Sequence, residues 1–291
     1  MQPDLSIVIV NWNTRDMLRD ALNSLLAPGS DLRLQIIVVD NASGDGSAAM
    51  VQAEFPTVEL LANTGNAGYA EGNNQGMRTA AGRHTLLLNP DVVVPAGALE
   101  GALQVLESDP KIGALGCRLV GADGRTQRSV RGFPTPGSIL WEALGLSRLF
   151  PASPLFGAYR MTHFDYDRQA DVDQPMGTFL LLRGEAVRQV GLLDERFPIF
   201  FNEVDWCYRA KQRGWRIVYT PSVQIKHYGG ASTGQVAPAM AWESRRGLLA
   251  YYGKHYGGPR YAPIRALAAA ASWLQAWRVA ARRGAVRNHA A

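Results

Sequence analysis

The sequence predicts an α/β protein with an open, mostly parallel central sheet flanked by helices. Over the first 91 residues, short apolar runs rich in β-branched residues alternate with helical stretches, which is the pattern of βαβ units with right-handed crossovers. Each apolar run ends in polar residues, and ligands of such sheets bind outside the carboxyl ends of the strands. A content of 47% hydrophobic and 19% charged residues excludes a mainly disordered chain.

The first half of the chain justifies this fold element by element. The apolar run 5–10 predicts a buried strand, and the helical stretch that follows over about 14–26 is ended by Pro28 and Gly29. Further buried strands are expected over 35–39, 58–61 and 86–88. The polar residues behind these strands should gather around one cleft: Asn11, Asn13, Asp40, Asn63 and Asp91.

The second half of the chain is less regular. Asp123 and Gly124 predict a hairpin turn, and the segment 133–166, rich in Pro, Gly and aromatic residues, predicts long loops with a short helix near 138–145. The remaining expected elements are a helix over 202–213, strands over 216–220 and 223–227, and two final helices over about 239–256 and 264–283.

The net charge of +5 conceals two regions of opposite sign. From residue 244 onward the chain has nine Lys and Arg and no acidic residue, a charge of +9, whereas residues 1–243 carry −4. An anionic partner is therefore expected to meet the tail first.

The two cysteines, Cys117 and Cys207, are too few for a disulfide framework or a multi-cysteine zinc site. The start Met1–Asp4 lacks the features of a signal peptide, so we expect a reducing, cytoplasmic compartment.

Two polar segments are candidates for ligand binding. Asp40–Ser47 lies between a strand and a helix, where a carboxylate can accept a hydrogen bond from a nucleobase or a ribose hydroxyl. The equal alternative is a purely structural Asx-turn with Ser or Asp as the N-cap of the helix. The segment 63–76 is rich in Gly and Asn, and glycines at 68, 72 and 76 predict a tightly packed helix face. It lacks the Gly-Lys-Ser/Thr ending of a P-loop, and a flexible loop is its alternative.

Carboxylates and one histidine are the candidates for chemistry. Asp91, in Asn89-Pro90-Asp91 behind a strand, can hold a divalent metal that bridges two phosphates, although such a tripeptide is more often only a turn. His227 can complete that metal site, against the alternative of a structural histidine. Glu203 and Asp205 stand two residues apart at a helix start, so they point to different faces. At most one should face the cleft as a general base, and the other caps the helix.

Together these segments resemble the family 2 glycosyltransferases of the GT-A fold, especially the rhamnosyltransferase-like branch that acts on bacterial surface polysaccharides. The resemblance runs in order from Ser6 to about His255. The motifs that carry it are 8–13, 38–43, 63–76, 89–91, 177–179, 191–195, 200–206 and 227–232. It implies a GT-A catalytic domain over 1–235, with a nucleotide-sugar-binding half over 1–115 and an acceptor-side half over 116–235. A basic helical extension over 236–291 follows.

The resemblance implies transfer of a sugar, with rhamnose as one candidate, from a dTDP- or UDP-linked donor with inversion at the anomeric carbon. The acceptor is a hydroxyl of a glycan or a lipid-linked molecule in cell-surface polysaccharide assembly. The implied donor contacts are Asn11, Asn13, Asp40, Asn63, Asn66, Asn89, Arg245 and Arg246. The two arginines can equally pair with Glu203 or Glu243. The implied acceptor side consists of Gly177, Thr178 and Trp206.

The resemblance also implies Mg²⁺ or Mn²⁺ at Asp91, with His227 as a further metal or diphosphate contact. Asp91 matches the last residue of the family's Asp-x-Asp motif, and Asn89 replaces the first Asp, so we expect weaker metal affinity. The family usually has Glu-Asp before Val-Asp, whereas this chain has Asn202-Glu203. Glu203 thus occupies the base position with one more methylene, and Asp205 is the second candidate.

The expected helix over 264–283 carries an apolar stripe with Trp273 and Trp277, and most of its arginines lie opposite. This pattern suits an interfacial helix on anionic lipid at the inner face of the cytoplasmic membrane. Docking on the protein's own body or on a second copy in a homodimer is a nearly equal alternative. A lipid-linked acceptor favours the membrane.

Three other classes of function fit the sequence less well than glycosyl transfer. A non-catalytic sugar-nucleotide-binding or scaffold protein of the same fold is disfavoured because Asp40, Asp91, Glu203 and His227 are all present. A nucleotidyltransferase needs a Gly-rich basic loop near the N-terminus, which residues 11–15 do not supply. Nucleic-acid binding by the basic tail lacks any recognised module.

Overall fold

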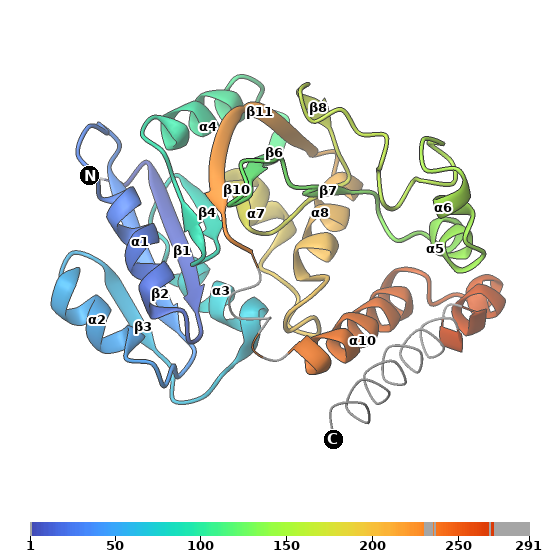
Figure 1. Cartoon of the computed structure of the whole chain (residues 1–291), viewed down its shortest axis with the longest axis horizontal. Helices are drawn as coiled ribbons and strands as arrows, with labels where there is room; N and C mark the ends of the chain where they lie inside the picture. Colours follow the sequence, from blue (N-terminus) through green and yellow to red (C-terminus); the bar gives the residue numbers. More distant parts are fainter. Residues whose placement is uncertain (1, 230–234, 236, 268, 271–291) are drawn as a thin grey trace. The chain divides into compact units, whose positions relative to one another are not determined.

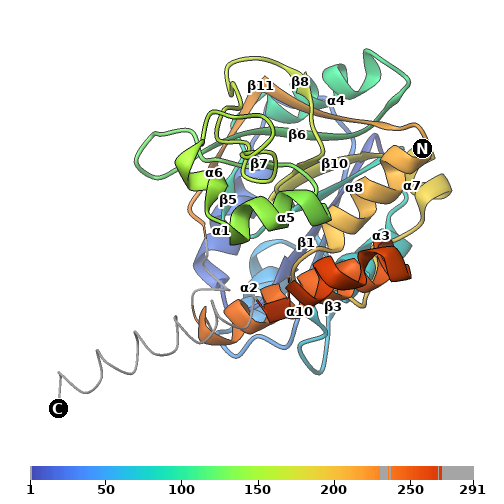
Figure 2. The same cartoon turned by 90° about the vertical axis from the view of Figure 1, so that its right-hand side faces the viewer.

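The computed structural model describes residues 2–229, 235, 237–267 and 269–270, which form two compact units (Figures 1 and 2). Unit 1 consists of Met1–Arg131 and Phe164–Gln235, and unit 2 of Gly132–His163 and Val236–Ala291. Residues 132–163, which lie within the acceptor-side half expected over 116–235, are in the same compact unit as the C-terminal segment. The catalytic domain over 1–235 and the basic extension over 236–291 stay predictions.

The first four long strands of unit 1 form the parallel sheet that the sequence predicts. They are β1 (Leu5–Asn11), β2 (Leu34–Asp40), β3 (Glu59–Ala62) and β4 (His84–Leu88), in the spatial order β3-β2-β1-β4. β1 and β2 pair in parallel from their first residue to their last, so the two strands end side by side. The carboxyl ends of all four strands therefore lie at one edge of the sheet.

The sheet continues through strands that change direction. β10 (Phe179–Arg183) pairs antiparallel with both β4 and β6 (Ile112–Val120). The sequence pattern did not single out β10 or β6. β11 (Arg216–His227) is parallel to β6 and therefore runs in the same direction as β1. It combines the two strands expected over 216–220 and 223–227, with an irregularity in pairing between Thr220 and Gln224. The carboxyl end of β11 thus reaches the same sheet edge as the ends of β1–β4.

Short strands complete the described part of unit 1. β5 (Val92–Val93) and β8 (Ala170–Asp171) pair antiparallel with β11, and β7 (Val130–Arg131) pairs with β9 (Gln174–Pro175) in a separate small sheet. The predicted turn at Gly124 is confirmed, because its φ is 75° and its amide donates to the carbonyl of residue 121.

Three helices cover one face of the sheet: α1 (Arg15–Leu25), α2 (Ser47–Glu54) and α4 (Ala98–Glu107) (Figure 1). Their apolar side chains form one core cluster with Leu5, Ile7 and Ile9, which alternate along β1 and so share a face.

The opposite face carries α3 (Gly68–Thr79), α7 (Gly184–Val190) and α8 (Asn202–Gln212) (Figure 2). A Cβ added to Gly72 would lie 2.9 Å from a methyl carbon of Val10, and one added to Gly76 would lie 2.4 Å from a methyl carbon of Val8. The glycines thus let the α3 backbone approach β1 closely, which confirms the tight packing that their spacing predicts.

Unit 2 is helical. It contains α5 (Pro136–Ala143), α6 (Leu146–Leu149), α10 (Ala237–His255) and the short 3₁₀ helix η1 (Pro259–Tyr261), and residues 262–267 are again helical. Most of the final helix expected over 264–283 lies outside the described residues. Within the part of the chain that the structure describes, none of the helices combines the length and the apolar character that a membrane span requires.

Replacing Gly76 by Ala is expected to destabilise the protein by about 2 kcal/mol, because overpacking a filled core costs about 1–3 kcal/mol. Gly101→Ala in α4 is the matched control: its Cβ would lie 3.4 Å from Val223 and the helix would gain roughly 0.5–1 kcal/mol. Denaturant titration measures both free energies of unfolding. Equal values for the two variants would contradict the close contact of α3 with β1.

Candidate functional site

The sheet edge gathers most of the residues that the sequence analysis selected. Asn11 and Asp40 are register partners at the ends of β1 and β2. Asn63 follows β3, Asp91 follows β4, and His227 is the last residue of β11. These positions come together because all five strands run in the same direction.

A hydrogen-bond network joins the ends of β1 and β2. The carboxylate of Asp40 accepts from the side-chain amide of Asn11 at 2.8 Å and from the backbone amide of Ser43 at 2.9 Å. The amide oxygen of Asn11 accepts from the hydroxyl of Thr14 at 2.6 Å. Asn11 and Asp40 are both buried. In this arrangement, the two side chains expected to contact the nucleotide hold the loops that follow β1 and β2.

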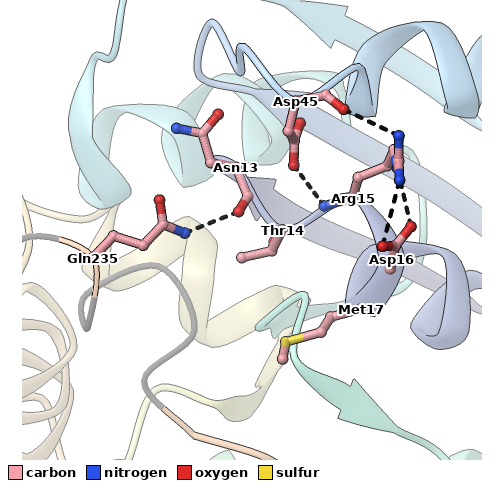
Figure 3. Close-up of a pocket in the computed structure, with 7 residues that line it drawn as sticks. All are labelled: Asn13, Thr14, Arg15, Asp16, Met17, Asp45 and Gln235. Carbon is pink, nitrogen blue, oxygen red and sulfur yellow. Dashed lines mark hydrogen bonds and ion pairs between the residues drawn. The ribbon is translucent and has the colours of Figure 1, made fainter.

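A pocket of about 350 Å³ opens beside this network (Figure 3). The residues that line it are Asn13, Thr14, Arg15, Asp16, Met17, Asp45 and Gln235. Asn13 has a φ of 54°, and its side-chain oxygen accepts from the amide of Gly44 at 2.8 Å. The backbone amide of Arg15 donates to Asp45 at 2.8 Å. The pocket walls are therefore fixed by the two loops that Asp40 and Asn11 hold.

The loop after β3 is fixed by asparagine side chains. The side-chain amide of Asn63 donates to Asn41 and to Gln75, each at 2.9 Å. Asn41 in turn donates to the carbonyl of Gly68 at 3.0 Å, and Asn66 accepts from the amide of Gly68 at 2.9 Å. These contacts determine where α3 begins relative to β2.

Asp91 and His227 face each other. Nε2 of His227 lies 3.5 Å from Oδ1 of Asp91, and both side chains are almost fully buried. Nδ1 of His227 is 2.7 Å from the side-chain oxygen of Gln127, whose amide nitrogen donates to the His227 carbonyl at 3.0 Å. These contacts orient the imidazole with Nε2 toward Asp91. The backbone amide of Asn89 donates to the carbonyl of Thr178 at 3.0 Å, which connects the end of β4 to the start of β10.

The donor set of this pair fits a divalent cation that is shared with a ligand. In the described part of the chain, no group of three or more His, Cys, Asp or Glu side chains lies close enough to hold a metal unaided. A carboxylate and an imidazole are nevertheless accepted ligands of first-row divalent ions, and Mg²⁺ commonly takes its remaining oxygens from phosphates and water. A cation held by this pair would therefore need further oxygens from outside the protein.

Glu203 lies at the start of α8, where burial raises the pKa of its carboxyl from 4.5 to about 7. Phe201, just before the helix, has a φ of 72°, a strained conformation for a bulky residue. A Cβ added to Gly177 would meet the Glu203 side chain at 3.5 Å, so the glycine leaves space beside the carboxyl.

Tyr69 lies close to the same region of the site. Its hydroxyl donates to the carbonyl of Gly177 at 3.0 Å. Burial and the charges of Glu203 and Asp91 all raise the pKa of Tyr69, so both carboxyls lie within electrostatic reach of one phenol.

Asp205 and Trp206 take a different place on the same helix. Asp205 is fully buried and pairs with Nε of Arg209 at 2.7 Å, and Arg209 also donates to the carbonyl of Leu192. The Trp206 side chain is fully buried and its indole N–H donates to the carbonyl of Gly191 at 2.9 Å. The two residues fix α8 against the segment before it, and neither presents a free surface in this structure.

Arg245 and Arg246 belong to α10 of unit 2. Arg246 pairs with Glu243 at 2.9 Å, which is one of the alternatives considered from the sequence. The guanidinium of Arg245 lies 5.7 Å from the centre of the Trp242 ring.

Three residues of the site were not predicted from the sequence: Asp45, Tyr69 and Gln127. Asp45 and Tyr69 lie within segments that the sequence analysis selected, whereas Gln127 carries no signal because it meets His227 from 100 residues away.

Comparison with known proteins agrees with this geometry. The profile of the family described as "Glycosyl transferase family 2" matches residues 6–169, more than half of the chain. An N-acetylglucosaminyl-diphospho-decaprenol L-rhamnosyltransferase of Mycobacterium tuberculosis is 28% identical over 272 residues, 90% of this chain and 88% of the relative. A low-salt glycan biosynthesis hexosyltransferase of Haloferax volcanii is 24% identical over 231 residues, 78% of this chain and 68% of the relative.

The fold also has counterparts among solved structures. The mannosyltransferase PcManGT from Pyrobaculum calidifontis, in complex with GDP-Man and Mn²⁺, superimposes with a TM-score of 0.60 at 18% identity, covering 97% of this chain and 76% of that one. This likeness confirms the expected GT-A fold. The family profile carries the assignment further: the chain belongs to glycosyl transferase family 2.

Proposed function

We propose that this chain is an inverting glycosyltransferase that moves a sugar from a nucleoside diphosphate to a hydroxyl of a glycan or lipid-linked acceptor during cell-surface polysaccharide assembly. The observation that carries the proposal is the Glu203 carboxyl, whose pKa is about 7, beside Gly177 at the sheet edge that also holds Asp91 and His227. The name of the mycobacterial relative, an L-rhamnosyltransferase, supports rhamnose as the sugar and a lipid-linked acceptor.

The donor is a dTDP- or UDP-linked sugar. Asn13 and Asp45 line the pocket of Figure 3, where amide and carboxylate groups offer hydrogen bonds to a base and a ribose. Asp40 and Asn11 hold the pocket loops in place, and Asn63 and Asn66 do the same for the neighbouring loop. This proposal differs from what the resemblance implies, which made Asn11, Asn13, Asp40, Asn63 and Asn66 donor contacts; Asn13 keeps that role, and the other four hold the loops.

Asp91 and His227 would hold Mg²⁺ or Mn²⁺. A cation bound there would supply positive charge against the negative charge that develops on the leaving diphosphate. Asn89 contributes no charge, so we expect weaker metal affinity than two carboxylates would give. Gln127 orients the imidazole of His227 and thereby keeps Nε2 available on the Asp91 side.

Glu203 is the general base. Its carboxylate accepts the proton of the acceptor hydroxyl while the hydroxyl oxygen attacks the anomeric carbon, and the bond to the diphosphate breaks on the opposite side. A pKa near the working pH serves a general base best, because a substantial fraction is ionised and that form is still a strong proton acceptor. Asp205 is the weaker candidate because its carboxylate is committed to Arg209.

The basic extension adds a finer proposal. The helix expected over 264–283 binds an anionic membrane surface, which makes the enzyme peripheral to the cytoplasmic membrane. The alternative is that this helix docks on the protein's own body or on a second copy in a homodimer. A lipid-linked acceptor favours the membrane.

Glu203→Gln should abolish transfer, with a loss of about 10²–10⁴-fold in kcat, while donor affinity stays within a factor of about two. The change removes the proton acceptor and keeps the shape of the side chain. Steady-state transfer assays and donor titration measure the two quantities. Glu195→Gln, which alters a carboxylate that is half exposed to solvent, is the control and should retain activity. Unchanged turnover in Glu203→Gln would exclude Glu203 as the base. If the wild-type protein bound the donor fully but transferred no sugar, a non-catalytic sugar-nucleotide-binding protein would be favoured.

Stability should also report the Glu203 carboxyl. A folded-state pKa of about 7 against 4.5 means that the unfolded chain loses this proton first, so wild type loses stability as pH rises from about 4.5 to about 7. Glu203→Gln escapes this loss and should be more stable than wild type by roughly 1–3 kcal/mol at pH 8, with little difference near pH 4.5. Denaturant titration at both pH values checks the sign. A constant difference across this range would contradict the raised pKa.

Metal and donor should stabilise the protein jointly. A ligand at about 100 times its Kd adds about 2.7 kcal/mol to the free energy of unfolding. We expect a dTDP- or UDP-sugar to raise the melting temperature more with Mg²⁺ or Mn²⁺ than with EDTA. Asp91→Asn and His227→Ala should remove the metal-dependent part of that increase, whereas Asp123→Asn, in an exposed turn, should keep it. If no nucleotide or nucleotide sugar stabilises wild type with either metal, the donor site is wrongly assigned.

A further inference from the structure

Unit 2 presents large apolar side chains to solvent within one short segment. Leu144, Leu149, Phe150 and Leu155 are 59%, 71%, 52% and 61% exposed, the highest values among the large hydrophobic residues that the structure describes as exposed. In a folded protein, apolar groups gathered in this way mark a surface that meets a partner or a membrane. We call residues 144–155 the apolar segment.

The apolar segment is held by its own packing. The ring of Phe156 lies 5.4 Å from the rings of both Trp141 and Phe150, with Trp141 in an edge-on arrangement. Glu142 in α5 pairs with Arg160 at 2.7 Å, beyond the other end of the segment. Gly145 has a φ of 75° and connects α5 to α6. The exposed leucines therefore project from an ordered element rather than from an extended linker.

The charge of unit 2 indicates what covers this segment. Unit 2 contains eleven basic and two acidic residues, a net charge of +9, whereas unit 1 carries −4. Both acidic residues are already neutralised, Glu142 by Arg160 and Glu243 by Arg246. Arg148 stands inside the apolar segment, directly before Leu149 and Phe150. Exposed apolar side chains in a unit of net positive charge match the interface of an anionic lipid bilayer, which offers acyl chains and negative headgroups together.

The same charge argues against a second copy as the occupant. Two copies of unit 2 that met through this surface would bring two charges of +9 together, and like charges oppose association. An apolar protein partner would leave the net positive charge of unit 2 uncompensated. Lipid satisfies both features of the surface.

We propose that the apolar segment 144–155 inserts into the interface of an anionic lipid membrane, with Leu149, Phe150 and Leu155 in the acyl region and Arg148 at the headgroups. This segment is distinct in sequence from the helix expected over 264–283. The proposal rests on unit 2 alone and goes beyond the transfer reaction, although a lipid-linked acceptor would give the binding a purpose.

The first test is sedimentation of the full chain with vesicles. Wild type should bind vesicles that contain phosphatidylglycerol and should bind phosphatidylcholine vesicles much more weakly. Leu149→Ser combined with Leu155→Ser should weaken binding about tenfold, whereas Leu26→Ser, which changes an exposed leucine of unit 1, should not. The melting temperature should be unchanged in both, because the altered side chains are exposed. Equal vesicle binding by the double variant and wild type, or no binding by wild type, would overturn the proposal.

The second test locates the contact. A polarity-sensitive fluorophore on Leu149→Cys can be attached selectively because Cys117 and Cys207 are buried. Its emission should shift to the blue on phosphatidylglycerol vesicles, and the same label on Leu26→Cys should not shift. Vesicle binding without a shift at position 149 would mean that other basic residues carry the binding, and the proposal would fail. A monomer–dimer equilibrium that the double variant abolishes would identify a second copy as the occupant and would also overturn it.

The two proposals fail separately. The Leu149→Ser, Leu155→Ser variant should transfer sugar to a water-soluble acceptor at the wild-type rate. Loss of that activity in a folded double variant would show that the segment serves the transfer reaction itself, and the lipid proposal would fall. Absence of transfer by wild type with every donor and acceptor, together with normal vesicle binding, would refute the proposed function and leave the lipid surface standing.

Discussion

The buried carboxylate of Asp40 is the interaction on which the site depends. A carboxylate removed from water must be compensated by hydrogen bonds, and Asp40 obtains them from Asn11 at the end of the neighbouring strand and from the Ser43 amide. Since β1 and β2 pair residue by residue, this bond can form only in one register. It therefore couples the alignment of the sheet to the shape of the two loops that surround the pocket, and a slip of either strand would dismantle both.

The two acidic residues of α8 show how position on a helix separates chemical roles. Glu203 and Asp205 are two residues apart and so point in different directions. Asp205 meets Arg209 one turn later and forms a buried ion pair, whereas the Glu203 carboxyl is desolvated beside a glycine. Desolvation raises the pKa of the Glu203 carboxyl to about 7, whereas the Asp205 carboxylate is held in an ion pair. Two environments on one helical turn thus give one carboxyl that is suited to proton transfer and one that holds structure.

The part of the fold with regular periodicity could be predicted from the sequence. The strands from β1 to β4 and the glycine face of α3 follow from local patterns of apolar residues and glycines. β10 could not be placed in this way, because a short apolar run does not reveal its direction or its neighbours. Gln127 has the same limitation, because its role comes from His227, 100 residues away, and only the three-dimensional structure brings the two together. The pair of Asp205 and Arg209 is different, since it lies one helical turn apart and is a local pattern. The grouping of residues 132–163 with the C-terminal segment is equally non-local.

The close approach of α3 to β1 affects how the sheet edge at the carboxyl ends of the strands would respond to a ligand. Gly72 and Gly76 lie so near Val10 and Val8 that the helix cannot slide or rotate against the strand without a collision of backbone and side chain. Helix and strand are therefore expected to move together as one rigid unit. Little conformational entropy is left to lose on that side of the sheet edge, so a ligand bound there would meet a preformed surface.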